Sequence, residues 1–259
     1  MFQEERLRSI IDYLKKAKRI SVDEICSLFD VSRDTARRDL VKLEEDKAII
    51  RTRGGAILPS GQHVIKDYSN RLSLVSSEKK RIGKKAASLI MPGDYIILDT
   101  STTVQACAEH IKDIECTVIT NSINQADILA KNSQAHIQLL GGEFHKEHRY
   151  LYGTSVIEKL SHYHVDKTFI GCVGISEKGL TVAHEEDGMV MQKMMQQADQ
   201  VILLADHTKI GVTGYFRCAT LNDIDLFITD QEIDEEFQEL LEKHGVELLI
   251  VSQTHDGGR

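Results

Sequence analysis

No apolar run in this sequence approaches the roughly 18 to 20 residues that a helix needs to span a bilayer. The first residues, MFQEERLRSII, carry charge where a signal peptide has its apolar segment. These two absences argue against a membrane-embedded and a secreted protein. We therefore expect a cytoplasmic globular protein with no membrane partner.

Paired cysteines are also absent. The five cysteines are odd in number, widely separated and contain no CxxC spacing, which argues against a disulfide framework and a zinc knuckle. We expect them to be small buried apolar side chains: Cys26, Cys107, Cys116, Cys172 and Cys218.

The usual signatures of hydrolysis and phosphoryl transfer are missing. The sequence has neither a GxSxG elbow nor a Walker glycine run followed by Lys and Ser or Thr. Its histidines occur as HKEH at 145–148, HYH at 162–164 and His184, none with the HExxH spacing of zinc proteases. We therefore predict no catalytic residue, no cofactor and no metal site.

Charge is distributed unevenly along the 259 residues, whose formal net charge is −8. Residues 1–58 contain 13 Lys and Arg against 11 Asp and Glu, while the remainder contains 19 against 29. An acidic body repels nucleic acid, so we expect any DNA contact to be confined to the mildly basic first 58 residues.

The first 58 residues show the pattern of three short helices. Leu7, Ile10, Ile11 and Leu14 form the apolar stripe of the first. The segment ISVDEI then predicts a second helix with Ser21 as N-cap, Glu24 as its capping-box partner, and Ile20 and Ile25 as a hydrophobic staple. This helix should end near Asp30, where a tight turn leads to the third.

The third helix should bury Ala36, Leu40 and Leu43, with Arg38 and Lys42 on its opposite face. Two β-prone runs about a Gly-Gly turn, AIIRTRGGAIL, follow it. The order of these features predicts a winged helix-turn-helix that binds double-stranded DNA, with a merely solvated charged helix as the alternative.

Beyond a predicted linker at residues 59–75, the pattern changes to seven short, almost continuously apolar runs separated by helical stretches. Such runs indicate parallel strands that are buried on both faces, hence a layered α/β domain over residues 76–252, with a frayed tail at 253–259. The runs are YIILD (95–99), CTVIT (116–120), HIQLL (136–140), KTFIGCV (167–173), VILLA (201–205), DLFIT (225–229) and ELLIV (247–251).

Polar residues follow several of these runs, where ligands bind in open α/β sheets. Hydroxyl groups, close-approach glycines, a carboxylate and a lysine at one edge of the sheet suit a small anionic ligand with hydroxyls, such as a sugar phosphate. The alternative for each Ser, Thr or Asn is a purely structural helix cap.

In their order along the chain, several motifs resemble the deoxyribose-operon repressor (DeoR) family of bacterial transcription regulators. The motifs are VSRDTARRDLVKLEEDKAIIRTRGGA, EKKRIGKKAASLIMPGDYIILDTSTT, TVITNS, LLGG, DKTFIGCVGIS with GLT, and ILLADHTKIG. The resemblance implies a winged helix-turn-helix joined to a sensor domain related to ribose-phosphate isomerase and glucosamine-phosphate deaminase. Such a sensor binds a phosphorylated sugar and alters operator affinity.

Matched residue by residue, the resemblance assigns two sets of contacts. The reading helix and wing are Ser32, Arg33, Thr35, Arg37, Arg38, Arg51, Arg53 and Gly54, to which the helix pattern adds Lys42. The effector loops are Asp99, Ser101, Thr102, Thr103, Asn121, Ser122, Gly141, Gly142, Asp206 and Lys209.

Some positions depart from the family pattern. Ser101 stands where glycine is commoner, Lys47 replaces the usual helix-ending glycine, and Ala36 replaces a larger aliphatic residue. The helix before ILLAD reads EEDGMVMQKMM, which places Lys193 out of the usual register, so the identity of the effector does not carry over.

We predict a regulator, most simply a repressor of a carbohydrate-utilisation operon, that binds its operator as a symmetric homo-oligomer. The rival hypothesis is a sugar-phosphate isomerase or deaminase with an accessory DNA-binding head, for which Asp99, Asp206, Glu185 and Glu186 would be the acid and base candidates. A third is a DNA-binding protein whose sensor pocket has degenerated.

Overall fold

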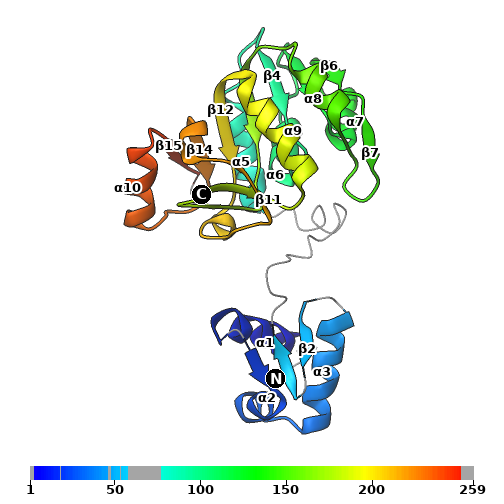
Figure 1. Cartoon of the computed structure of the whole chain (residues 1–259), viewed down its shortest axis with the longest axis vertical. Coiled ribbons are helices and arrows are strands. Elements are labelled where there is room, and N and C mark those ends of the chain that lie inside the picture. Colours follow the sequence, from blue (N-terminus) through cyan, green and yellow to red (C-terminus); the bar gives the residue numbers. More distant parts are fainter. Residues whose placement is uncertain (1–2, 18, 46–47, 53, 58–76, 252–259) are drawn as a thin grey trace, which may run out of the picture. The chain divides into compact units, whose positions relative to one another are not determined.

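The computed structural model describes residues 3–17, 19–45, 48–52, 54–57 and 77–251. The predicted linker, the predicted tail and Arg53 of the wing lie outside the described residues. The chain divides into two compact units, Met1–Ile65 and Lys66–Arg259, which are coloured blue and cyan to red in Figure 1. Among the described residues, no helix combines the length and the apolar character that a membrane span requires.

The first unit contains three helices and a small antiparallel sheet of strand order β1-β3-β2 (Figure 1). Ile10, Leu14, Ile25 and Leu40 are fully or almost fully buried between them and form its core. The elements are α1 (Gln3–Ala17), β1 (Arg19–Ser21), α2 (Val22–Phe29), α3 (Arg33–Glu45), β2 (Ile50–Thr52) and β3 (Gly55–Ile57).

The predicted capping box fixes the start of α2. The Glu24 backbone N–H donates to the Ser21 hydroxyl oxygen at 3.1 Å, and the Ser21 N–H donates to the Glu24 carboxylate at 2.7 Å. At the other end Asp30 adopts a left-handed conformation with φ of 50°, which turns the chain toward α3. Both ends of the predicted second helix are therefore confirmed.

A buried ion pair joins α1 to α3. Arg6 Nε lies 2.5 Å from Asp39 Oδ2, and Arg6 Nη2 lies 3.2 Å from Asp39 Oδ1. The Asp39 side chain is fully buried and also accepts a hydrogen bond from Gln3 Nε2 at 3.1 Å. The apolar stripe of α3 gave no sign of this carboxylate, because a charged residue in a helix pattern normally indicates a solvated face.

The wing is the hairpin of β2 and β3, in which Thr52 pairs with Gly55 across a two-residue turn. Gly54 in that turn has φ of 96°, which a residue with a side chain rarely adopts. Gly55 packs so closely on β1 that a Cβ atom there would lie 2.1 Å from the Ile20 carbonyl oxygen. The third strand, β1, is too short for the sequence pattern to reveal.

The second unit is built on a seven-stranded sheet in the order β15-β14-β12-β9-β4-β5-β6, with every neighbouring pair parallel. All seven apolar runs supply one strand each, as predicted. The strands are β4 (Tyr95–Leu98), β5 (Thr117–Thr120), β6 (His136–Leu139), β9 (Val165–Ile170), β12 (Ala198–Leu204), β14 (Leu226–Thr229) and β15 (Glu247–Ile250).

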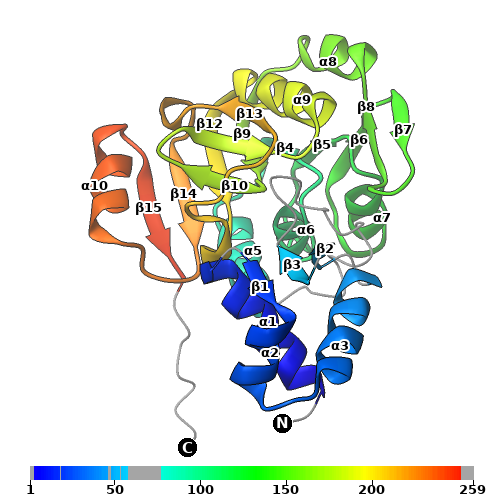
Figure 2. The ribbon, with the colours of Figure 1, turned by 60° about the horizontal axis from the view of Figure 1, so that its bottom comes forward.

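Both faces of the sheet are covered. Ile96 and Leu98 pack into the core beneath α5 and α6, whereas Ile97 between them packs with α8 and α9 on the opposite face. Figure 2 shows α8 and α9 side by side. The helices are α5 (Ser77–Ala87), α6 (Thr102–Ala108), α7 (Ile123–Asn132), α8 (Thr154–Leu160), α9 (Glu185–Gln196) and α10 (Glu235–Lys243).

Two smaller sheets complete the unit. A three-stranded sheet, β10-β11-β13, packs with α9, α10 and the main sheet around a separate core, and a two-stranded hairpin joins β7 to β8. The strands are β7 (Glu143–His145), β8 (Tyr150–Tyr152), β10 (Gly174–Ser176), β11 (Gly179–Val182) and β13 (Phe216–Ala219).

Burial on both faces was wrong for the two outermost runs. None of the four residues of β6 is fully buried, and none of β15 is either. Each strand lies at an edge of the sheet and has one neighbour, so its side chains lack covering atoms on one flank.

Candidate nucleic-acid interface and ligand site

Helix α3 presents a cationic face to solvent. Arg33, Arg37, Arg38 and Lys42 are all exposed, while Thr35 is half-buried. Ser32 precedes the helix and caps it, because the Thr35 N–H donates to the Ser32 hydroxyl oxygen at 3.2 Å and the two hydroxyl groups lie 2.9 Å apart. A structural role is thus visible for Ser32 and Thr35, beside the DNA contact predicted for them.

Three of the predicted arginines form surface ion pairs within the unit. The shortest joins Arg33 to Asp23 at 2.5 Å, Arg51 lies 3.4 Å from Glu44, and Arg37 lies 3.9 Å from Asp34. Exposed pairs of this kind contribute little stability, so they can open when phosphates approach.

Arg38 and Lys42, in contrast, have no ion-pair partner among the described residues. They are four residues apart on one helix and therefore share a face. This places two uncompensated cations on the side of α3 that faces solvent.

A groove separates α3 from the wing. Arg33 and Arg37 line it from the helix, and Arg51, Thr52 and Gly54 line it from the hairpin. The fold therefore brings Arg33 and Arg37 together with the wing residues Arg51 and Gly54, whereas Arg38 and Lys42 line a separate hollow beside Asp34 and Glu45. Arg53 lies outside the described residues.

The predicted ligand loops lie at the carboxyl ends of the strands of the second unit. From β4 the chain proceeds outward to β5 and β6 and then returns to β9, on the other side of β4. The strand order thus reverses between β4 and β9. Open α/β sheets bind ligands in the crevice at the carboxyl ends of the strands on either side of such a switch point, so a ligand crevice is expected here.

Asp99 ties the two strands together at this crevice. One of its carboxylate oxygens accepts a hydrogen bond from the Ser101 N–H and the other from the Gly171 N–H, both at 2.7 Å. The residue is only 3% exposed. Its geometry holds the loop after β4 against the loop after β9.

Gly171 was not among the predicted site residues, although it stands in the motif DKTFIGCVGIS. A Cβ atom at this position would lie 2.3 Å from the Ser101 hydroxyl oxygen, so only glycine fits without displacing the loop. Sequence spacing cannot reveal this contact, because the residues are 70 positions apart.

The loop after β4 caps the N-terminus of α6, and a lysine lies beside it. Ser101 accepts a hydrogen bond from the Val104 N–H at 3.1 Å and begins α6, in which Thr102 and Thr103 are buried. Lys79 of α5 reaches this first turn and donates to the Thr102 hydroxyl oxygen at 3.1 Å. Lys79 is thus a second cation at the site that the sequence motifs did not indicate.

The loop after β12 contributes Asp206 and Lys209. Asp206 is buried and accepts hydrogen bonds from the backbone N–H of Thr208 at 3.0 Å and from its hydroxyl group. Burial raises the pKa of the neighbouring Cys172 thiol, Lys209 opposes this rise, and Asp206 and Asp99 add to it. The charges of Lys209, Asp206 and Asp99 thus all act on Cys172, which remains a protonated thiol.

The loop after β5 contributes Asn121 and Ser122, both buried. Ser122 caps α7 by accepting from the Gln125 N–H at 3.3 Å. Asn121 Nδ2 donates to the Leu151 carbonyl oxygen at 2.8 Å, whereas its Oδ1 has no hydrogen-bond partner among the described residues. A buried acceptor without a partner is costly, so Asn121 Oδ1 is suited to a donor supplied by a ligand or a water molecule.

Gly141 and Gly142 follow β6, two strands from β4 in the sheet. Gly142 packs against its own chain, because a Cβ atom there would lie 2.5 Å from the Tyr152 carbonyl oxygen and from Val156 Cγ2. Gly141 has open space around it. The fold therefore gives Gly142 a packing role, and its predicted ligand contact stays a prediction, like those of the other loop residues.

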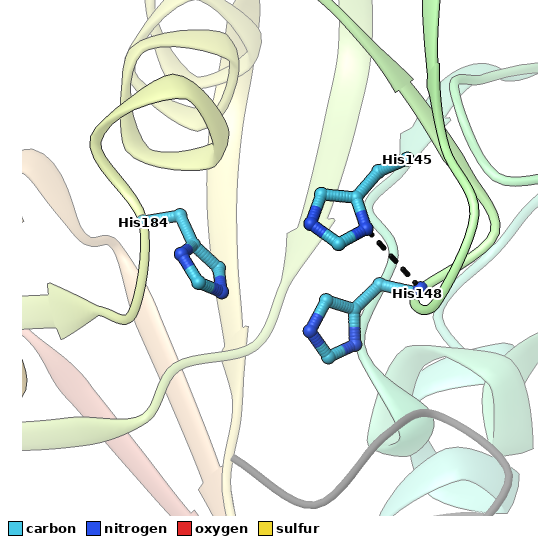
Figure 3. A group of neighbouring side chains, drawn as sticks. All are labelled: His145, His148 and His184. Carbon is cyan, nitrogen blue, oxygen red and sulfur yellow. Dashed lines mark hydrogen bonds between the residues drawn. The ribbon is translucent and has the colours of Figure 1, made fainter. Parts of the chain in front are cut away.

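The fold also gathers histidines that the sequence analysis treated as separate. His145 ends β7, His148 lies in the hairpin turn, and His184 precedes α9; their ligand atoms all lie within 4.8 Å of one another (Figure 3). The prediction of no metal site compared local spacings only, and the third ligand comes from a segment 36 residues away. His162 and His164 are not part of this group.

The acid and base candidates of the rival enzyme hypothesis are otherwise engaged. Both oxygens of Asp99 accept backbone N–H donors, and Oδ1 of Asp206 accepts two hydrogen bonds from Thr208. Glu185 and Glu186 are exposed in the first turn of α9. The two aspartates thus have structural roles in organising their loops.

Comparison with known families decides between these readings. Residues 6–62 match the family described as the DeoR-like helix-turn-helix domain, and residues 75–231 match the DeoR C terminal sensor domain. The chain belongs to the DeoR family. The two matches cover both units of this DeoR-family protein and confirm the predicted fold class.

Full-length relatives support the same assignment. The chain is 62% identical over 253 residues to the HTH-type transcriptional repressor GlcR of Bacillus subtilis, covering 98% of each protein. It is 28% identical to the glycerol-3-phosphate regulon repressor of Escherichia coli, over 96% of this chain and all of that one. The protein is therefore a transcriptional regulator, and the prediction of a regulator in place of an isomerase or deaminase is confirmed.

Solved structures of lower similarity include ribose 5-phosphate isomerase A of Methanocaldococcus jannaschii, with a TM-score of 0.37 and 17% identity over 51% of this chain and 53% of that one. At this level the likeness carries no argument about ligand or activity.

Proposed function

We propose that this DeoR-family regulator is a cytoplasmic repressor of a carbohydrate-utilisation operon, and that a phosphorylated sugar bound in the second unit weakens its hold on operator DNA. The proposal is carried by the exposed cationic face of α3 in one unit, and it is supported by the strand-order switch point of the other, where Lys79 hydrogen-bonds to Thr102 beside the end of β4. The 62% identical relative is itself a transcriptional repressor, which favours repression over activation.

Helix α3 enters the major groove in this proposal. Arg38 and Lys42 have no intramolecular ion pair among the described residues, so no such pair must be broken before they contact base edges or phosphates. Arg33, Arg37 and Arg51 line the groove toward the wing and exchange surface carboxylates for DNA phosphates.

The effector occupies the crevice between β4 and β9. Lys209 and Lys79 supply positive charge for a phosphate, beside the backbone N–H groups of the Ser101 loop. The partnerless Asn121 Oδ1 is an acceptor for a sugar hydroxyl. Cations and neutral acceptors in one crevice together favour a phosphorylated sugar over a simple anion.

Control of DNA binding then follows from linkage. The effector shifts the DNA equilibrium only as far as it prefers one arrangement of the oligomer over another. In a symmetric oligomer, the spacing of the paired α3 helices must match the spacing of two operator half-sites. An effector that favours an arrangement with a different spacing therefore lowers operator affinity.

A thermal-shift screen of the full chain against sugar and polyol phosphates tests the effector assignment. At a ligand concentration 100 times the dissociation constant, one site stabilises the folded state by about 2.7 kcal/mol. Lys209→Met should abolish the shift, whereas Lys178→Met, at an exposed position in the turn between β10 and β11, should retain it.

The outcomes separate the possibilities clearly. A shift that Lys209→Met removes supports the sensor and identifies its ligand class. A shift that both variants retain would place the ligand elsewhere. No shift with any sugar phosphate would contradict the effector assignment, and it is the result expected for a degenerate pocket or for a different kind of ligand. Operator binding, measured separately by fluorescence anisotropy, tests the DNA-binding half of the proposal.

A further inference from the structure

Three histidine rings converge between the β7–β8 hairpin and the start of α9. The ring centroids of His145 and His148 are 4.8 Å apart. The ring centroid of His184 lies 5.8 Å from that of His145 and 5.7 Å from that of His148. Figure 3 shows the three rings directed toward a common gap, two from the hairpin and one from the opposite side.

The hairpin side of this cluster is held in place by the fold. The Ile123 N–H donates to the Arg149 carbonyl oxygen at 3.1 Å, and the Leu151 N–H donates to that of Asn121 at 2.8 Å. Tyr150, which is 3% exposed, stacks on His145 with a centroid separation of 5.1 Å. His148 is itself only 6% exposed. Two of the three imidazoles are therefore positioned before any ligand arrives.

The surroundings of the cluster are acidic. Glu143 lies in β7, the strand that ends at His145, and Glu185, Glu186 and Asp187 form the first turn of α9 directly after His184. A dication at the histidines would thus be partly balanced by nearby negative charge.

We propose that His145, His148 and His184 form a binding site for a divalent transition-metal ion, with Zn²⁺ as the preferred occupant and a fourth coordination position left for water. Imidazole nitrogen is a good ligand for zinc, copper and nickel and a poor one for magnesium and calcium. Three histidines with one open position are a known tetrahedral zinc arrangement. The three histidines are not among the proposed effector residues, although Asn121 of that set hydrogen-bonds to Leu151 of the same hairpin.

Metal binding requires a small closure of the cluster. Nitrogens bonded to one tetrahedral zinc at about 2.1 Å are about 3.4 Å from one another, compared with the 4.8 Å that bounds the present separations. His145 Nδ1 now accepts a hydrogen bond from the His148 N–H at 3.4 Å. Coordination through His145 Nε2 places the ring proton on Nδ1 and gives up this bond, which is long and therefore weak.

The ion would fasten α9 to the hairpin. Helix α9 packs into two cores at once, with Val190 and Met194 in one and Met191 and Met195 in the other. Closure at His184 therefore acts on a helix that joins the main sheet to the small β10-β11-β13 sheet. The metal site thereby gives the second unit a stabilising crosslink that the chain alone does not supply.

Equilibrium dialysis of the full chain, stripped with a chelator and titrated with Zn²⁺, tests the proposal. One Zn²⁺ per chain is expected for the wild type. His184→Gln, at the partly exposed position, should weaken binding by more than about 100-fold, the upper end of what loss of an outer-shell partner causes. Co²⁺ in place of Zn²⁺ should give the visible absorption of a four-coordinate site.

His162→Gln is the matched control, since His162 is exposed and outside the cluster, and it should bind like the wild type. Circular dichroism of each stripped variant checks that its fold is retained. His145→Gln provides a second variant at the cluster if His184→Gln fails to fold. Equal Zn²⁺ binding by folded His184→Gln and wild type, or no stoichiometric binding by the wild type, would overturn the proposal.

Discussion

Two buried aspartates show how the same residue type serves different ends here. Asp39 holds α3 to α1 through the Arg6 guanidinium, and Asp99 holds the loops after β4 and β9 through two backbone N–H groups. Each carboxylate has replaced its water contacts with fixed donors, so removing the donors leaves a buried charge without compensation. Each buried aspartate therefore positions a proposed binding surface: Asp39 positions the DNA-reading helix α3, and Asp99 positions the ligand loops.

Arg6→Ala should destabilise the first unit by about 3 to 5 kcal/mol, because it leaves Asp39 charged and buried without its cation. Denaturant unfolding of the full chain, followed by a probe in the first unit, measures the loss. Arg8→Ala, on the same helix but exposed, is the control and should change stability little. A loss below 1 kcal/mol for Arg6→Ala would show that the ion pair is not an important tie.

Gly171→Ala should destabilise the second unit by about 1 to 3 kcal/mol and abolish effector binding, since its Cβ atom would lie 2.3 Å from the Ser101 hydroxyl oxygen. Gly141→Ala is the matched control for stability alone, because a Cβ atom there meets nothing within 4 Å. Thermal unfolding of each variant, with and without the effector, measures stability and binding. Equal stability of the two variants would contradict the close approach of Gly171 to Ser101.

At the scale of an element, α3 combines a buried stripe with a cationic exposed face, and its effect on DNA depends on which cations are available. Arg33, Arg37 and Arg51 face carboxylates of their own unit, whereas Arg38 and Lys42 do not. The second pair is therefore the sharper place to test DNA recognition.

Arg38→Ala should cost operator affinity by about 1 to 3 kcal/mol if the guanidinium makes a bidentate base contact. Lys42→Ala should weaken all sequences alike and reduce the dependence of affinity on salt by about one counterion if it contacts a phosphate. Anisotropy titrations at several salt concentrations with operator and scrambled DNA separate the two roles. Unchanged operator affinity for Arg38→Ala would remove this residue from the interface.

The capping box of α2 gives a pH-dependent prediction. Hydrogen bonds from Ser21, first through its side chain and then through its backbone, hold the pKa of Glu24 below its ordinary 4.5. A lowered folded-state pKa stabilises the fold above the unfolded value, and this contribution is lost as pH falls through the lowered pKa.

Glu24→Gln should therefore reduce the fall in stability of the first unit between pH 7 and pH 3, because glutamine keeps the cap but does not titrate. Unfolding at the two pH values measures the difference. Ser21→Ala, by comparison, should lower stability by about 1 kcal/mol at neutral pH through loss of the cap. If the stability of Glu24→Gln depends on pH as that of the wild type does, the ionised Glu24 carboxylate does not stabilise the fold.

At the scale of the whole molecule, the proposed DNA-binding face and the proposed effector site lie in different units, so communication between them is a coupling free energy and must be reciprocal. If a sugar phosphate weakens operator affinity by a given factor, operator DNA must weaken sugar-phosphate affinity by the same factor. Calorimetric titration of the effector with and without saturating operator measures it. Effector affinity that is unchanged by saturating operator would show that the two sites are not coupled, and would contradict control of DNA binding by the effector.

The sequence by itself determined the three helices and the wing of the first unit and the seven strands of the main sheet, because helix caps, apolar stripes and apolar runs are local patterns that depend on residues a few positions apart. It did not reveal β1 or the strands of the two smaller sheets. It also determined the family, because the motifs occur in one order along the chain. Only the tertiary structure decided what meets at each site. Asp39 with Arg6, Gly171 with Ser101, Lys79 with Thr102, and His184 with the hairpin histidines are contacts between distant segments. Sheet order and helix packing create such contacts, and no local spacing encodes them.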